Sequence, residues 1–105
     1  MKETAIDKLS YEEKHKLSIT NREKFFGYYA DKLLTFTEPY SQVYNNSLTE
    51  AKWFTGGKLN ACYNCVDRHV LQTPDKVAII YSDNDDKVIQ YTYNDVLHNV
   101  LIYAN

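Results

Sequence analysis

Apolar positions recur with helical spacing in the first third of the chain. Ser10 followed three residues later by Glu13 is a capping-box pattern, which indicates the start of a helix. Thr20 with Glu23 repeats the pattern before a second segment, residues 21–36. In that segment the large apolar side chains share one helical stripe: Phe25, Phe26, Tyr29, Leu33 and Leu34. The pattern predicts a helical hairpin.

Pro39 marks the end of this helical pattern. The residue before a proline avoids helical backbone, so the second helix should end before Glu38. Residues 39–50 are rich in Asn, Ser and Tyr and show little periodicity, which predicts an ordered loop that crosses to another part of the fold. Inside this loop, Ser47 and Glu50 have the spacing that caps one short turn.

Two glycines and a second proline delimit a compact helix in the middle of the chain. Gly56 and Gly57 tolerate positive φ and predict a sharp reversal. The residues from Asn64 to Leu71 then form a short helix that ends at Thr73-Pro74.

A β-hairpin is predicted from Lys76 onward. Two runs of β-branched and aromatic residues flank the polar positions 82–86, and Val77 to Tyr81 is expected to be buried. The acidic tip resembles the opening of a calcium loop, but the positions that require Gly and Glu hold Val88 and Asn94. We therefore expect a solvated turn.

A final amphipathic helix is predicted to start at Thr92, because Asp95 follows it with capping-box spacing. No Gly or Pro interrupts its apolar stripe before Asn105. We therefore expect the natural partner of the stripe to lie further along a longer polypeptide. The stripe consists of Val96, Leu97, Val100, Leu101 and Tyr103.

These elements predict an α+β fold with N-terminal helical segments, an ordered loop, a short helix, a β-hairpin and a final amphipathic helix. We expect one domain over residues 1–105, with a helical part at about 10–73 and a hairpin–helix part at about 76–105.

Composition narrows the classes of partner. The 105 residues carry 12 basic and 14 acidic side chains, a net charge of −2, which argues against nucleic acid. No stretch approaches the roughly 18 consecutive apolar residues of a membrane span, and the charged N-terminal segment does not resemble a signal peptide. We expect a cytoplasmic protein in which Cys62 and Cys65 remain thiols.

The spacing of Cys62, Cys65 and His69 suits one helical face, which raises the question of a metal or redox site. A structural zinc site needs four ligands, and the chain offers no second pair. A thioredoxin-type motif needs a βαβ context, which the Gly-Gly turn does not supply. We expect small buried thiols.

No residue is assigned a catalytic, cofactor-binding or metal-binding role. Asp67, Arg68 and His69 are consecutive, so on a helix they point in three directions, and structural salt bridges or caps are the favoured interpretation. His15 and His98 lack a neighbouring nucleophile and carboxylate and are expected at the surface. The three glycines form no phosphate-binding loop.

The sequence resembles the N-terminal region of AMP-forming acetyl-CoA synthetases. The resemblance rests on W-F-x-G-G-x-L-N followed by N-C-x-D-R-H, then D-K-x-A-I-I and T-Y-x-x-x-L, and it extends upstream to about Tyr11. The matching positions are Trp53, Phe54, Gly56, Gly57, Leu59, Asn60, Asn64, Cys65, Asp67, Arg68, His69, Asp75, Lys76, Ala78, Ile79, Ile80, Thr92, Tyr93 and Leu97, with Tyr11, Ser18, Ile19, Phe25, Phe26 and Gly27 upstream.

This resemblance implies a fragment of the large N-terminal domain of an adenylate-forming ligase. The parent enzyme uses ATP and magnesium to convert acetate to acetyl-adenylate and then transfers the acetyl group to CoA. In such enzymes the phosphate loop, the acetate pocket and the catalytic lysine follow the matched region. We therefore expect no cofactor site and no catalysis in this chain alone.

Three hypotheses about the function of the chain remain open. The chain is either the N-terminal part of such a ligase, with the remainder of that enzyme as partner, or a stand-alone module that binds an acyl-CoA synthetase chain or self-associates through its exposed stripe. A third hypothesis is a small metal or redox protein built on Cys62 and Cys65.

Overall fold

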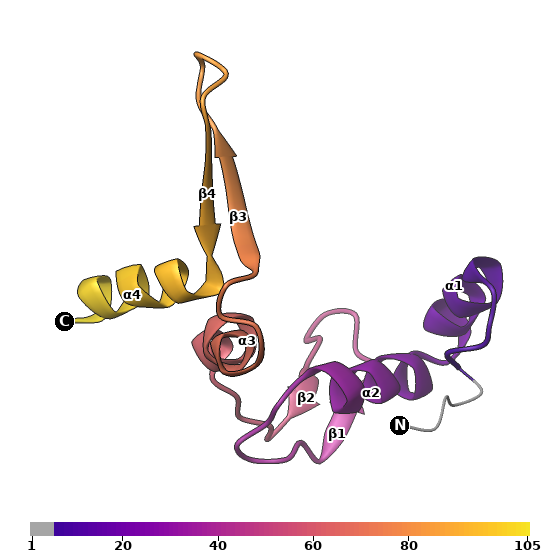
Figure 1. Cartoon of the computed structure of the whole chain (residues 1–105). Coiled ribbons are helices and arrows are strands. Elements are labelled where there is room, and N and C mark those ends of the chain that lie inside the picture. Colours follow the sequence, from indigo (N-terminus) through magenta and orange to yellow (C-terminus); the bar gives the residue numbers. More distant parts are fainter. Residues whose placement is uncertain (1–5) are drawn as a thin grey trace. The chain divides into compact units, whose positions relative to one another are not determined.

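The computed structural model describes residues 6–105, and the chain divides into two compact units, Met1–Leu59 and Asn60–Asn105 (Figure 1). Helices and small antiparallel strands together confirm the α+β class. The first unit contains α1 (Tyr11–Thr20), α2 (Arg22–Leu33), β1 (Gln42–Tyr44) and β2 (Trp53–Thr55). The second contains a π-helical turn, η1 (Tyr63–Asp67), then α3 (Arg68–Gln72), β3 (Val77–Ser82), β4 (Val88–Thr92) and α4 (Tyr93–Ala104).

Two helices open the first unit, as predicted, but their junction differs from the prediction. The Ser10–Glu13 capping box is present, with the Glu13 amide donating to Ser10 Oγ at 3.2 Å. Thr20 does not cap α2, because its hydroxyl donates to the carbonyl of Lys16 inside α1. Asn21 ends α1 and caps α2 through its side-chain oxygen, so a single residue joins the helices.

The predicted loop after α2 contains a strand. β1 pairs antiparallel with β2, with Gln42 opposite Thr55 and Tyr44 opposite Trp53. Three-residue strands are too short to show the alternation that predicts a strand from sequence. The Ser47–Glu50 turn is confirmed, because the Glu50 amide donates to Ser47 Oγ at 3.1 Å.

Aromatic rings hold α2 against this small sheet. Trp53 stacks on Tyr44 with ring centroids 4.4 Å apart, and the Phe26 ring meets Trp53 edge-on at 5.1 Å. The predicted α2 stripe is only partly covered, since Phe26 and Leu33 stay exposed. The residues that α2 buries are the small ones, Gly27 and Ala30, because a flat helix face lets β1 approach closely.

The glycine pair makes the predicted reversal between β2 and the end of the first unit. Gly56 has φ +79°, a conformation that side-chain-bearing residues rarely adopt. Gly57 serves a different need, because a Cβ there would lie 3.0 Å from the Tyr40 Cβ and 3.1 Å from the Phe36 ring. The first glycine permits the turn and the second permits the packing.

The second unit begins with the predicted compact helix. Asn60 caps it by accepting the Tyr63 amide at 2.9 Å, and the helix ends before Thr73-Pro74 as expected. Its middle is a π-turn, in which the Arg68 amide reaches back five residues to the Tyr63 carbonyl.

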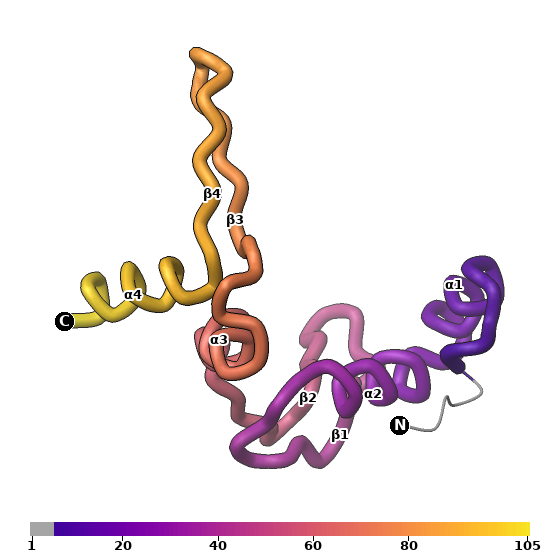
Figure 2. Tube along the Cα trace, in the orientation of Figure 1, coloured from indigo at the N-terminus to yellow at the C-terminus, as the bar shows by residue number. Residues whose placement is uncertain are grey.

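The hairpin and the final helix follow as predicted. β3 and β4 pair antiparallel from Val77–Thr92 to Ser82–Val88, and Figure 2 shows the two strands side by side along their length. At the tip, Asp83 Oδ1 accepts the amides of Asp85 and Lys87, each at 2.9 Å, which confirms a hairpin turn. The Thr92–Asp95 capping box then starts α4.

The expected burial of Val77 to Tyr81 is wrong. Ile79 is 48% exposed and Ile80 67% exposed, because a two-stranded hairpin gives each strand only one neighbour. Across residues 60–105, all of which the structure describes, the one buried residue is a polar one, Asn64. The second unit therefore has no buried hydrophobic core.

Replacing Thr92 with Ala should weaken α4. The Asp95 amide loses its acceptor, and loss of an N-cap side chain costs about 0.5–2 kcal/mol. Hydrogen exchange of the first-turn amides of α4 measures this. Thr49→Ala, which changes a hydroxyl that contacts the Ser47 hydroxyl at 3.4 Å in the first unit, is the matched control. Equal exchange in the two variants would contradict the cap.

The same capping box should make α4 sensitive to acid. Hydrogen bonds from the Thr92 amide and then the Thr92 hydroxyl lower the pKa of Asp95. Their stabilising contribution is complete above the unfolded carboxyl pKa, ~3.9, and is lost as pH falls through the lower folded value. Far-UV circular dichroism should show a loss of helix in strong acid that is smaller in Asp95→Asn, and the opposite order would refute the linkage.

Candidate functional site

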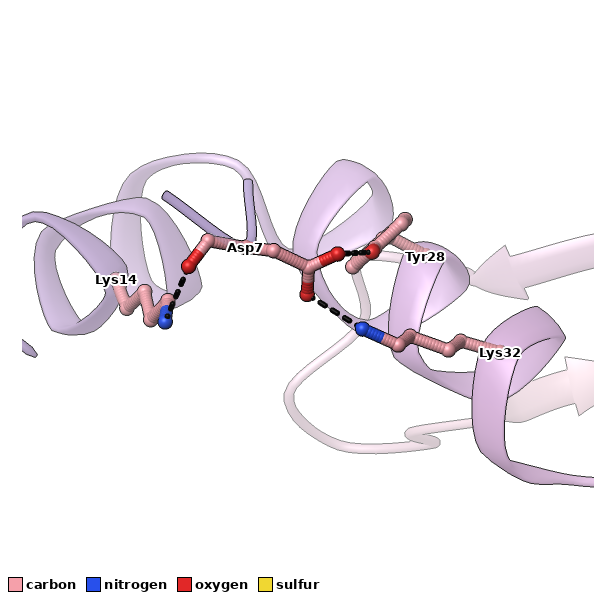
Figure 3. A network of polar contacts seen from close by, with 4 residues as sticks. All are labelled: Asp7, Lys14, Tyr28 and Lys32. Atoms are coloured by element: carbon pink, nitrogen blue, oxygen red, sulfur yellow. Dashed lines mark hydrogen bonds and ion pairs between the residues drawn. The ribbon is translucent and has the colours of Figure 1, made fainter. Parts of the chain in front are cut away.

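Titratable side chains of the first unit gather around Asp7, which sequence reasoning missed (Figure 3). One carboxylate oxygen accepts a hydrogen bond from the Tyr28 hydroxyl, and the other pairs with Lys32 Nζ at 2.6 Å. Lys14 Nζ donates to the Asp7 backbone carbonyl at 3.0 Å. The only sequence signal was the i, i+4 spacing of Tyr28 and Lys32 on one face of α2.

The Asp7 network ties the start of the described residues to α2. The hydrogen bond to Asp7 raises the pKa of Lys32, so this amine stays a cation and cannot act as a base near neutral pH. We interpret the network as structural.

A second polar contact of the first unit joins Tyr40 to α2. The Tyr40 hydroxyl donates to Asp31 Oδ1 at 2.6 Å, and this bond, with burial as the smaller cause, raises the pKa of Tyr40 to about 12. The Tyr40 ring packs edge-on against Phe54 at 5.2 Å. The contact fixes the connector after α2, and no sequence pattern predicts it.

The Cys62–His69 segment holds the residues that carried the family resemblance. Arg68 Nη1 donates to the side-chain oxygen of Asn64 at 3.2 Å, and the His69 ring stacks on Tyr93 at 4.9 Å. Asp67 makes no helix cap, and its carboxylate raises the pKa of the Cys62 thiol. The expected salt bridges and caps are therefore wrong, although the three side chains do diverge.

The cysteines are less buried than expected. Cys65 is exposed and Cys62 is half-buried, because the helix that carries them is not covered by a core. His15 and His98 are exposed, as predicted. Among residues 6–105, no group of three or more His, Cys, Asp and Glu side chains is placed to hold a metal ion.

An apolar groove runs between the hairpin and α4. Its volume is about 520 Å³. None of the helices in residues 6–105 has the length and apolar character that a membrane span requires. The groove is lined by Ile79, Tyr81, Tyr91, Val96, Asn99, Val100 and Tyr103.

These lining residues come from two predicted elements, the hairpin and α4. Val96, Val100 and Tyr103 come from the predicted stripe of α4, and Ile79 and Tyr81 come from the strand that was expected to be buried. The stripe therefore faces the hairpin only in part, and Leu101 of the stripe remains 54% exposed.

Comparison with known proteins finds matches to acetyl-coenzyme A synthetases. The family model described as acetyl-coenzyme A synthetase N-terminus matches residues 11–65. The chain is 42% identical over 98 residues to an acetyl-coenzyme A synthetase of Phycomyces blakesleeanus, which covers 90% of the chain and 15% of that relative.

Two further relatives have similar sequence identity to the chain. Acetyl-coenzyme A synthetase 2 of Debaryomyces hansenii is 47% identical over 79 residues, which are 73% of the chain and 12% of the relative. Acetyl-coenzyme A synthetase 2 of Saccharomyces cerevisiae is 42% identical over 99 residues, which are 90% of the chain and 14% of the relative. The chain thus spans about one seventh of the length of these relatives.

The Tyr40–Asp31 contact should be visible in an alkaline titration. One tyrosine should ionise near pH 12, and this step should be absent in Tyr40→Phe and move down in Asp31→Asn. The pair stabilises the fold fully below the unfolded tyrosine pKa of 10.0, and this contribution is lost as pH rises through about 12.

Ultraviolet absorbance of tyrosinate measures these steps. Tyr103→Phe is the matched control, because Tyr103 is 89% exposed. If Tyr103→Phe removed the late step and Tyr40→Phe did not, the contact would be refuted.

Proposed function

The chain belongs to the acetyl-coenzyme A synthetase N-terminus family, and we propose that it works as the N-terminal part of an acetyl-CoA synthetase. In this role it packs against the remainder of the enzyme and has no catalytic activity alone. The enzyme as a whole would convert acetate, ATP and CoA to acetyl-CoA, AMP and pyrophosphate. The proposal includes a cytoplasmic location, which fits two free cysteines.

The observation that carries the proposal is the lack of a hydrophobic core in the second unit. Ile79, Ile80 and Tyr81 are each about half or more exposed in residues 60–105, where no hydrophobic residue is buried. Burial of apolar surface stabilises by ~25 cal/mol per Å², so this unit gains stability when another surface covers it. Isolated two-stranded hairpins are marginally stable in water.

The relatives indicate what would cover this surface. They align to this chain over only 12–15% of their own length, so most of each enzyme is available as a partner. The apolar groove between β3 and α4 offers a docking surface that is continuous with the exposed hairpin. We therefore propose the remainder of such a synthetase as the occupant.

The absence of activity in the chain alone follows from the chemistry of adenylation. Transfer at a phosphoryl centre requires positioned cations and donors that stabilise several negative oxygens. ATP, magnesium and CoA would therefore be held by the remainder of the enzyme. The glycines of this chain, Gly27, Gly56 and Gly57, serve packing and a turn in the first unit.

A chimera tests the proposal. The aligned segment of the Saccharomyces cerevisiae relative is replaced by this chain, and acetate-dependent exchange of pyrophosphate into ATP is measured. The chimera should be active, and the chain alone should show no exchange. Ile79→Asp should reduce the chimera's activity roughly tenfold or more, because a charge would be buried at the interface.

Leu48→Asp is the matched control. Leu48 is 90% exposed in the first unit, so a charge there should leave the activity unchanged. Exchange activity in the chain alone would refute the structural role. If Ile79→Asp and Leu48→Asp had the same effect on the chimera, the result would favour a self-associating module instead. The same conclusion would follow if the chimera were inactive and the isolated chain formed a dimer.

A further inference from the structure

Arg68 begins α3, and its guanidinium is held by side chains of the preceding turn. Arg68 Nη1 donates to Asn64 Oδ1 at 3.2 Å, and Asn64 Nδ2 donates to the Asn60 carbonyl at 2.9 Å. Asn64 is 7% exposed, the one buried residue of the second unit, whereas Arg68 is half-buried. A buried amide that is bonded at both ends therefore orients the guanidinium of an arginine that a partner can still reach.

Contacts between residues distant in the sequence hold the start of α3 in place. The His69 ring stacks on Tyr93 at 4.9 Å between ring centroids. The Tyr93 amide donates to the Lys76 carbonyl at 3.0 Å. Arg68 therefore belongs to a segment that is tied to the first turn of α4, and its backbone is not a free helix end.

No carboxylate of the described chain pairs with Arg68. The ion pairs of residues 6–105 join Lys32 to Asp7 and Lys58 to Glu38, and both lie in the first unit. Over the same residues, the side-chain hydrogen bond of Arg68 is the one to Asn64. A guanidinium has five N–H donors. Most of these donors and the whole charge are therefore left for solvent or for a group outside this range.

The charge of the second unit favours a carboxylate as that group. A guanidinium binds a carboxylate through two parallel hydrogen bonds, and arginine is enriched among the residues that dominate protein interfaces. Residues 60–105 contain six aspartates and three lysine or arginine side chains. This excess of negative charge repels a phosphate, which carries more than one negative charge, more strongly than it repels a single carboxylate.

We propose that Arg68 is a docking residue, whose guanidinium pairs with a carboxylate side chain of the remainder of the synthetase. The inference rests on the proposed function and names the chemistry of the partner surface at one point. The chain aligns to 12–15% of the length of its relatives, so most of such an enzyme is available to supply the carboxylate. A bidentate pair also fixes orientation, which contact between apolar surfaces does not.

Chemical cross-linking in the chimera with the Saccharomyces cerevisiae relative tests the pair directly. In Arg68→Lys, a water-soluble carbodiimide should join the new amine to the contacting carboxylate with loss of one water. Peptide mass spectrometry should then find position 68 linked to an Asp or Glu of the remainder. The chimera with Arg68 unchanged should give no link at this position, and neither should the isolated Arg68→Lys chain, in which no carboxylate pairs with it.

Activity of the chimera tests what the pair contributes. Arg68→Gln should lower acetate-dependent exchange of pyrophosphate into ATP roughly tenfold or more, because the partner carboxylate is left without a counter-charge. Lys87→Gln, which removes the charge of an exposed lysine in the same unit, should match the unchanged chimera. Far-UV circular dichroism of the isolated chains should be alike for the two variants, since neither side chain forms an ion pair within residues 6–105.

Charge reversal closes the test. Arg68→Glu should inactivate the chimera, since two carboxylates then face each other. Replacing the cross-linked Asp or Glu with Arg in that same variant should restore most of the lost activity. Restoration by this exchange requires the two side chains to be in contact.

The outcomes separate this inference from the proposed function. An active chimera in which Arg68→Gln equals Lys87→Gln and no cross-link forms at position 68 would overturn the docking role and leave the proposed function standing. If Arg68→Gln raised the KM for ATP and left kcat unchanged, Arg68 would contact the substrate, and the docking role would be wrong. An unchanged chimera without activity would count against the proposed function, and this inference would fail with it.

Discussion

The structure is shaped by how little apolar surface this chain can bury. Among the described residues, the buried hydrophobic ones are Ile6, Ala30 and Tyr44, and all three belong to the first unit. A domain of about 100 residues normally buries well over half of the surface that its unfolded chain exposes. Here local hydrogen bonds define the elements, and the apolar faces of those elements stay exposed.

The first unit compensates with aromatic rings and specific polar contacts. Trp53 connects α2 to the small sheet through Phe26 and Tyr44, and Asp7 attaches the start of the described chain to α2. Gly57 is part of the same arrangement, because only a residue without a side chain fits beneath Tyr40. These contacts join residues that are far apart in the sequence, so they hold the first unit together without a large core.

The second unit has no equivalent compensation. Its capping box, π-turn and hairpin turn satisfy their own backbone groups, but β3 and α4 present apolar side chains to a groove that nothing in residues 60–105 fills. The chain spans about one seventh of the length of the synthetases it matches, and the proposed function assigns this groove to the remainder of such an enzyme.

The sequence by itself determined the elements that depend on neighbours a few residues away. The Ser10 and Thr92 capping boxes, the Gly56 turn, the hairpin at Asp83 and the family membership were all predicted, because their causes are local. Tertiary structure alone decided the β1–β2 pairing, the Asp7 and Tyr40 contacts and the exposure of Ile79 and Ile80. The burial of a strand depends on whether a second surface covers it, and the sequence of the strand alone does not predict whether that surface is present.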